Sequence, residues 1–206
     1  LGDVKENIVI TSNTHFNLSK KEIINQIIQA GSAGEYSKAV KYCKDFIDKG
    51  FSDPSVFCNY GFYLFALKRT KEAEIFTRKA IELKPDLSEA HFNLGNILST
   101  IGNFEEAEKS IRKAIQLKPD YIEAHNNLVG IQEELGNFEE AEKSIRKVIQ
   151  LQPDSAIANN TLAHIMSTFG NFQEAEVYQR KAIKLKPDFA VAYNDLGNTL
   201  RKLGKL

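Results

Sequence analysis

A Pro-Asp pair recurs every 34 residues along most of this chain of 206 residues. The four pairs are Pro85-Asp86, Pro119-Asp120, Pro153-Asp154 and Pro187-Asp188. Between successive pairs the sequence nearly repeats itself, since residues 102–120 and 136–154 differ only at Ala114/Val148 and Lys118/Gln152. A fixed period of this length is typical of stacked supersecondary units that bury their apolar faces only against their neighbours. The period therefore predicts a repeat array, a class that binds partners along an extended surface.

Each unit has the pattern of a helical hairpin. Between residues 88 and 117, apolar side chains fall at helical spacing first up to Ile101 and again from Phe104 onwards. Gly102 supplies the left-handed residue that ends the first helix. Pro119 ends the second helix, because a proline pushes the residue before it out of the α region.

Polar residues at the predicted helix starts suggest caps. Asn103 and Glu106 have the spacing of a capping box, and Asn137 with Glu140 and Asn171 with Glu174 repeat it. Asp120, followed by Glu123, is placed to cap the next first helix. We therefore expect side-chain caps at both kinds of helix.

These residues resemble the tetratricopeptide repeat (TPR) family, whose pattern is W-x2-L-G-x2-Y, then A-x3-F, then P. Here the pattern is His91-x2-Leu94-Gly95-x2-Leu98, Ala107-x3-Ile111 and Pro119. The resemblance implies an all-α fold, a right-handed α-solenoid of antiparallel helix pairs forming a TPR superhelix. It divides the chain into a non-repeating arm (1–19), five units (20–53, 54–87, 88–121, 122–155 and 156–189) and a partial unit (190–206). We expect a fragment of a longer bacterial TPR protein.

Composition excludes several functions. The 27 basic and 27 acidic residues give a net charge of zero, so the positive field that favours nucleic acid or an anionic membrane is missing. No run of about 18 apolar residues is present to span a bilayer. Cys43 and Cys58 have no metal-ligand spacing and fit a reduced, cytoplasmic setting. Without a phosphate-binding loop or a zinc motif, we expect no catalytic residue, no metal and no cofactor, and hence no enzyme in this chain.

One polar row is the candidate site. It stands just before each Leu-Gly-like pair and consists of Asn59, Asn93, Asn127, Thr161 and Asp195. The resemblance places this row on the inner, concave surface, where carboxamides can hold a peptide backbone because each offers a donor and an acceptor. The TPR superhelix of O-GlcNAc transferase is similar in having such an asparagine ladder. The alternative is that asparagine is simply common at this position of TPR units.

Further polar and aromatic residues flank this row. The predicted groove also includes Asn96, Asn126, Asn160, Asn194, Asn198, His164, Phe62 and Phe92. Phe62 and Phe92 are either an exposed anchor for a partner side chain or packing residues. Glu89 and Glu123 repel carboxylates, which disfavours the clamp by which some TPR modules bind chaperone tails.

Three functions follow as hypotheses. The first is a scaffold that binds an extended peptide or protein segment in the concave groove. The second is the substrate-recruiting N-terminal region of a larger transferase or oxygenase. The third is self-association through the C-terminal helix, whose Leu200 and Leu203 lack a covering second helix.

Overall fold

The structure, a computed structural model, describes residues 18–205, so that the predicted non-repeating arm lies outside it except for its last two residues. This part of the chain forms eleven α-helices and no strand. They are α1 (Lys20–Ser32), α2 (Tyr36–Asp48), α3 (Pro54–Ala66), α4 (Thr70–Leu83), α5 (Ser88–Thr100), α6 (Phe104–Leu117), α7 (Ile122–Glu134), α8 (Phe138–Leu151), α9 (Ala156–Thr168), α10 (Phe172–Leu185) and α11 (Ala190–Lys202). The predicted all-α class is confirmed.

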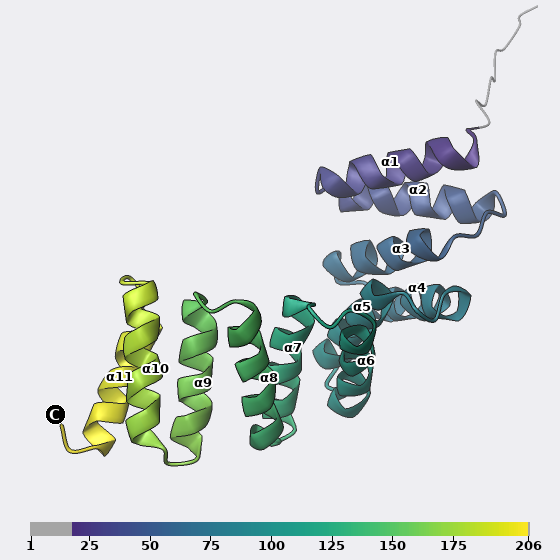
Figure 1. Ribbon diagram of the computed structural model, residues 1–206. Coiled ribbons are helices and arrows are strands. Elements are labelled where there is room, and N and C mark those ends of the chain that lie inside the picture. The colour runs from purple at the N-terminus through teal and green to yellow at the C-terminus, as the bar shows by residue number, and fades with distance from the viewer. Residues whose placement is uncertain (1–17, 206) are drawn as a thin grey trace, which may run out of the picture.

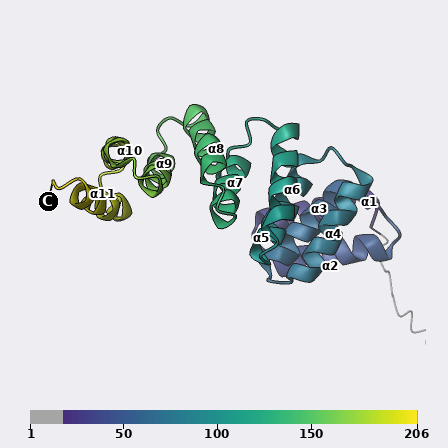
Figure 2. The same ribbon diagram turned by 90° about the horizontal axis from the view of Figure 1, so that it is seen from below.

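The helices pack in consecutive antiparallel pairs that stack into an α-solenoid. Each second helix lies against its own first helix and against the first helix of the next pair, so α6 contacts both α5 and α7. Figure 1 shows how the helix axes turn along the array: α1 to α3 lie across the view, while α7 to α10 stand upright. Seen from below, the C-terminal helices extend away from the N-terminal stack (Figure 2).

The first helices of the pairs form the inner side of the curve. They contact one another directly at every step except that from α7 to α9. In the part of the chain that the structure describes, no two second helices bring their backbones so close, although side-chain ion pairs link some of them. The side of a curved stack on which successive units lie closest is its concave side, so α3, α5, α7, α9 and α11 line the inner face.

The apolar core is divided along the axis. One cluster joins the first two pairs around Ile27 and Phe46, another centres on Leu98 and Ile111, and a third surrounds Ile145 in the C-terminal half. This division is the arrangement expected of a repeat array, in which each unit buries apolar surface only against its neighbours.

Glycine and proline end the helices where the sequence predicts. Gly102 has a φ of 79°, a left-handed conformation that costs glycine little. In the preceding pair the equivalent residue is Lys68, which adopts a φ of 63°. α6 ends at Leu117, two residues before Pro119.

The predicted side-chain caps are wrong. Asn103, Asn137 and Asn171 stand at the N-caps, but none of their side chains accepts a hydrogen bond from the helix backbone. Their ψ angles of 57–70° leave the extended conformation in which such a cap normally sits. Instead Asn103 Nδ2 donates to Glu106 Oε2 at 2.9 Å.

The cap predicted at Asp120 also fails, although α3 and α9 do have side-chain caps from Asp53 and Ser155. α7 has Tyr121 rather than Asp120 at its N-cap, with no side-chain cap bond, because the helix begins one residue later than the prediction placed it. A complete capping box does form in α1, where Ser19 and Glu22 bond each other's backbone N–H.

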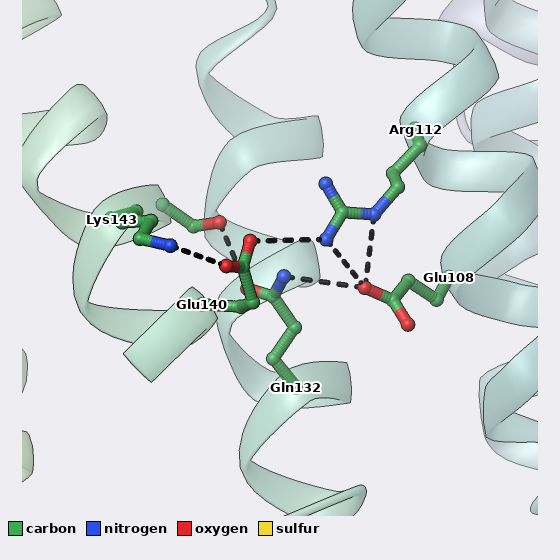
Figure 3. Close-up of polar contacts among 6 residues, drawn as sticks. Glu108, Arg112, Gln132, Glu140 and Lys143 are labelled. Carbon is green, nitrogen blue, oxygen red and sulfur yellow. Dashed lines mark hydrogen bonds and ion pairs between the residues drawn. The ribbon is translucent and has the colours of Figure 1, made fainter. Parts of the chain in front are cut away.

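The glutamates expected in capping boxes join successive second helices instead. Arg78 Nη2 lies 2.7 Å from Glu106 Oε1 and also bonds Glu74 of its own helix. Arg112 repeats the arrangement with Glu140 at 3.6 Å, as Figure 3 shows. The hydrogen bond from Lys143, with a smaller contribution from Arg112, lowers the pKa of the Glu140 carboxyl. Because these pairs are about half exposed, water screens their charges and each adds little to stability.

Candidate functional site

The inner face carries a pocket in the middle of the array, between α5 and α7. Its volume is about 580 Å³. Its walls comprise the carboxamides of Asn96, Asn126 and Asn127, the hydroxyls of Ser99 and Thr100, the carboxylate of Glu134 and the apolar groups of Phe65, Phe104 and Ile131. Three of the residues predicted for the groove therefore lie together in one cavity.

Gly130 opens this pocket. In the equivalent place of the other units the first helices carry Ile28, Phe62, Asn96, His164 and Asn198. A Cβ built on Gly130 would meet no atom within 4 Å, so the space beside it is unfilled rather than crowded. The missing side chain leaves room for a side chain from another molecule.

The predicted polar row also links successive first helices. Asn127 Nδ2 donates to Asn96 Oδ1 at 2.6 Å, and Asn93 Nδ2 donates to Cys58 Sγ at 3.4 Å. Asn127 nevertheless remains exposed. Its carbonyl oxygen has no hydrogen-bond partner among the described residues, so this side chain keeps an acceptor for a ligand.

The remaining carboxamides differ in exposure. Asn126, Asn194 and Asn198 are exposed, and Asn59 and Thr161 are half-buried. Asn160 is 7 % exposed and donates to Asp195 Oδ2 at 2.8 Å, which fixes α9 to α11. Asn160 is therefore placed to position Asp195 rather than to touch a ligand directly.

The inner helices are acidic although the chain as a whole is neutral. Within α3, α5, α7 and α9 the charged side chains are Glu89, Glu123, Glu133 and Glu134, with no lysine or arginine. Burial raises the pKa of the Glu133 carboxyl, while His164 of α9, which is exposed, opposes that shift. Most of the compensating cations lie on the second helices.

Nearby, two carboxylates act on a half-buried phenol just before α7. Burial raises the pKa of the Tyr121 hydroxyl to about 12, and the carboxylates of Glu89 and Glu123 add to the shift. The Tyr121 ring also stacks at a tilt on Phe92, with 4.8 Å between ring centroids. Phe92 is therefore partly occupied by its own chain.

Phe62 also packs within the chain, yet it keeps an open face. Its ring meets Tyr36 of the first pair edge-on at 5.8 Å, and 43 % of the residue stays exposed. Phe65 packs on the N-terminal core and lines the 580 Å³ pocket as well. Packing within the chain therefore accounts for part of this aromatic group, while the exposed face of Phe62 fits the anchor hypothesis.

Two of the histidines and both cysteines pack within the helix stack. Nε2 of His91 and Nε2 of His125 lie 2.9 Å and 3.0 Å from the carbonyls of Pro85 and Pro119. Because a carbonyl only accepts, each ring donates an N–H there. Burial raises the pKa of Cys43 to about 12 and that of Cys58 to about 11, which keeps both thiols protonated and unreactive near neutral pH.

Neither a metal-binding cluster nor a membrane-spanning helix is present among the described residues. Among residues 18–205 no three His, Cys, Asp or Glu side chains gather in a geometry suited to a metal ion. None of the helices α1 to α11 combines the length and the apolar character that crossing a bilayer requires.

Family models assign the repeats. Models described as tetratricopeptide repeat match residues 88–121, and also residues 54–87, 122–155 and 156–189. The chain belongs to the tetratricopeptide repeat family. The matched ranges of this TPR protein coincide with four of the units that the sequence predicts, and TPR proteins are in general scaffolds for protein interactions.

Solved structures of other TPR proteins share the fold. YrrB, described as a TPR protein with an unusual peptide-binding site, is 20% identical with a TM-score of 0.75, over 85% of this chain and 91% of YrrB. MamA from Desulfovibrio magneticus RS-1 is 18% identical with a TM-score of 0.75, over 83% of this chain and 97% of MamA. A TPR protein from Parabacteroides merdae is 19% identical with a TM-score of 0.77, over 90% of this chain and 74% of the other. A search of curated proteins gave no match.

The sequence predictions named three residues of the pocket in this TPR protein but missed others that line it. Gly130, Glu134 and Phe104 were not among the predicted site residues, although all three line the pocket. The signal was present: at this position glycine interrupts a row of larger side chains. The sequence alone does not reveal that this glycine opens a pocket, because that inference requires knowing that the row faces the inner surface.

Proposed function

We propose that this TPR array binds an extended, basic peptide segment along its inner face and anchors one large side chain in the pocket beside Gly130. The observation that carries the proposal is that pocket, where three carboxamides and an open acceptor on Asn127 surround unfilled space. Carboxamides bind a peptide backbone without selecting its side chains, since each supplies both a donor and an acceptor.

Charge supports a basic ligand. The inner helices α3, α5, α7 and α9 present four carboxylates and no cation, whereas α11, at the C-terminal end of the inner face, carries Asp195 together with Arg201 and Lys202. Complementary charge speeds encounter and disfavours wrong partners more than it adds affinity. A lysine or arginine in the pocket would lie between Glu134 and the rings of Phe65 and Phe104.

Peptides selected from a random library of 12-residue sequences test the proposal, with affinity measured by fluorescence anisotropy. We expect enrichment of lysine and arginine and a fall in affinity as salt rises. Asn127→Ala removes a backbone contact worth ~0.5–1.5 kcal/mol, which lowers affinity about 2- to 12-fold. Asn137→Ala, an exposed asparagine in the α7–α8 turn, is the matched control and leaves affinity unchanged.

A filled pocket gives the sharper test. Gly130→Asn supplies the side chain that Asn96 provides one unit earlier, so the fold tolerates it and replacement of a helical glycine stabilises the helix. We expect at least tenfold weaker peptide binding with an unchanged or higher unfolding temperature. Unaltered affinity in both Asn127→Ala and Gly130→Asn would remove this pocket from the function.

The alternative is that the same groove recruits substrates for a transferase or oxygenase domain. No observation on residues 18–205 favours this over peptide binding alone. The peptide selection described above tests both hypotheses, because each requires a peptide to bind at the inner face.

A further inference from the structure

Two pockets on the outer side of the solenoid repeat one unit apart. The first, of about 500 Å³, lies between α4, α5 and α6, and the second, of about 360 Å³, lies between α6, α7 and α8. Both have an isoleucine and a leucine in their walls: Ile81 and Leu94 in the first, Ile115 and Leu128 in the second. These pockets share no lining residue with the inner pocket.

A serine lies in each outer pocket where the neighbouring units carry an aromatic residue. Ser110 and Ser144 line the pockets, and the residues 34 positions before and after this pair are Phe76 and Tyr178. Phe76 fills its place by stacking on Tyr60, with 4.2 Å between centroids. The chain itself therefore shows that an aromatic ring fits between these helices.

Tyr178 shows how a phenol sits there. Its ring packs on the C-terminal core, as does Ile149, the counterpart of Ile81 and Ile115. Its hydroxyl accepts a hydrogen bond from Arg146 Nη1 at 3.4 Å. Arg78 and Arg112 are the counterparts of Arg146, and they line the two open pockets.

Cations dominate the rims. The first pocket has Arg78, Lys109 and Lys113 against Glu82 and Glu106, and the second has Arg112, Lys143 and Lys147 against Glu140. Figure 3 shows three of these groups at the second pocket, with Arg112 and Lys143 converging on Glu140. A cationic rim over an apolar floor suits an aromatic ring that is flanked by acidic residues.

We propose that these two pockets, the outer sockets, bind aromatic side chains, tyrosine above all, from an acidic segment of a partner protein. Tyrosine is favoured because Arg78 and Arg112 can donate to its hydroxyl as Arg146 donates to that of Tyr178. A partner protein is favoured over a free aromatic compound because only a molecule that presents two side chains gains from two similar sockets one unit apart. The outer sockets do not depend on peptide binding at the inner face.

The primary test uses N-acetyl-tyrosinamide as probe and amide NMR shifts of the whole chain as readout. We expect saturable shifts at Ser110 and His91 in the first socket and at Ser144 and His125 in the second. N-acetyl-leucinamide at the same concentration should bind at least fivefold more weakly. Equal binding of the two probes, or no shift at either socket, would overturn the proposal.

Filling one socket provides the matched control. Ser110→Tyr places in the first socket the residue that Tyr178 supplies two units later, while Ser110→Ala keeps the socket open. We expect the tyrosine variant to lose at least tenfold in probe affinity at the first socket and none at the second; the alanine variant retains both. Ser144 is left unchanged because its hydroxyl donates to the buried Gln132 at 2.8 Å. Probe shifts that persist around His91 in Ser110→Tyr would contradict the assignment.

A divalent probe tests the partner. An acidic peptide with two tyrosines joined by about 12 glycine and serine residues spans about 20 Å on average. It should bind several-fold more tightly than its one-tyrosine counterpart, because the second contact becomes intramolecular. Ser110→Tyr should abolish that gain. The absence of any gain in the unaltered protein would contradict a partner that uses both sockets.

Discussion

Lys68 is the residue at which the backbone of this array is most strained. It has a φ of 63° and is the one non-glycine residue with a positive φ in the described part of the chain. Its equivalents in the later units, such as Gly102 and Gly136, are glycines. A left-handed conformation costs a residue with a Cβ roughly 1–2 kcal/mol.

We therefore expect Lys68→Gly to raise the free energy of unfolding by about 0.5–1 kcal/mol, since the relief of strain exceeds the added entropy of the unfolded glycine. Urea denaturation of the variant and of the unaltered protein measures this change in the free energy of unfolding. Lys84→Gly is the control, because Lys84 has a φ of −144° and only the entropic cost remains. We expect Lys84→Gly to lower the free energy of unfolding. If Lys68→Gly lowered it as well, backbone strain at Lys68 would be excluded.

Single residues also show where prediction from sequence ends. Asn126 and Asn160 occupy the same place in successive units, and the pattern assigned both to the groove. Asn126 is exposed, whereas Asn160 is buried against α11 by its bond to Asp195. Periodicity identifies the face of a helix, but the exposure of one side chain depends on its neighbour in the next unit.

At the scale of helices, close approach within a pair depends on small residues, and the pairs differ. A Cβ on Gly95 of α5 would collide with the Ile111 side chain of α6. Gly197 holds the same position in α11, where a Cβ would meet nothing within 4 Å. The two glycines share a sequence pattern but not an environment.

We expect Gly95→Ala to lower the free energy of unfolding by ~1–3 kcal/mol through overpacking. Gly197→Ala should raise it by ~0.5–1 kcal/mol, because alanine favours the helix. Thermal and urea unfolding of the two variants measure the contrast. Effects of the same sign would mean that α5 and α6 relax freely around the added methyl group.

Helix ends were more predictable than helix caps. Glycine and proline act within a few residues, so Gly102 and Pro119 set the boundaries of α5 and α6 as the sequence predicts. The capping boxes failed because Glu106 pairs with Arg78, which lies 28 residues earlier. A contact of that range links two units, and a motif within a single unit cannot reveal it.

At the scale of the whole molecule, the net charge of zero does not show that acidic and basic residues are distributed unevenly. The chain is formally neutral, yet α3, α5, α7 and α9 have only acidic groups among their charged residues, apart from histidine. The outer sockets, in contrast, have more cations than carboxylates among their lining residues. The net charge of the sequence argues against a general positive field for nucleic acid, but it cannot show that two faces of the molecule differ in charge.

The separation of the core along the axis makes stability local. Ile145 is 2 % exposed in the C-terminal cluster, and Ile27 is 1 % exposed in the N-terminal one. Replacing either isoleucine with alanine removes buried apolar groups and leaves a cavity, which lowers the free energy of unfolding by about 2–5 kcal/mol. In an array with nearest-neighbour coupling, this loss falls on the adjacent helices first.

Hydrogen exchange of backbone amides measures where the loss occurs. Ile145→Ala should speed exchange in α7 to α10 by roughly 30-fold or more, and leave α1 to α4 nearly unchanged. Ile27→Ala should reverse the pattern, which makes each variant the control for the other. Because an array that unfolds only as a whole would lose protection everywhere in both variants, uniform acceleration would show that the clusters form one cooperative unit.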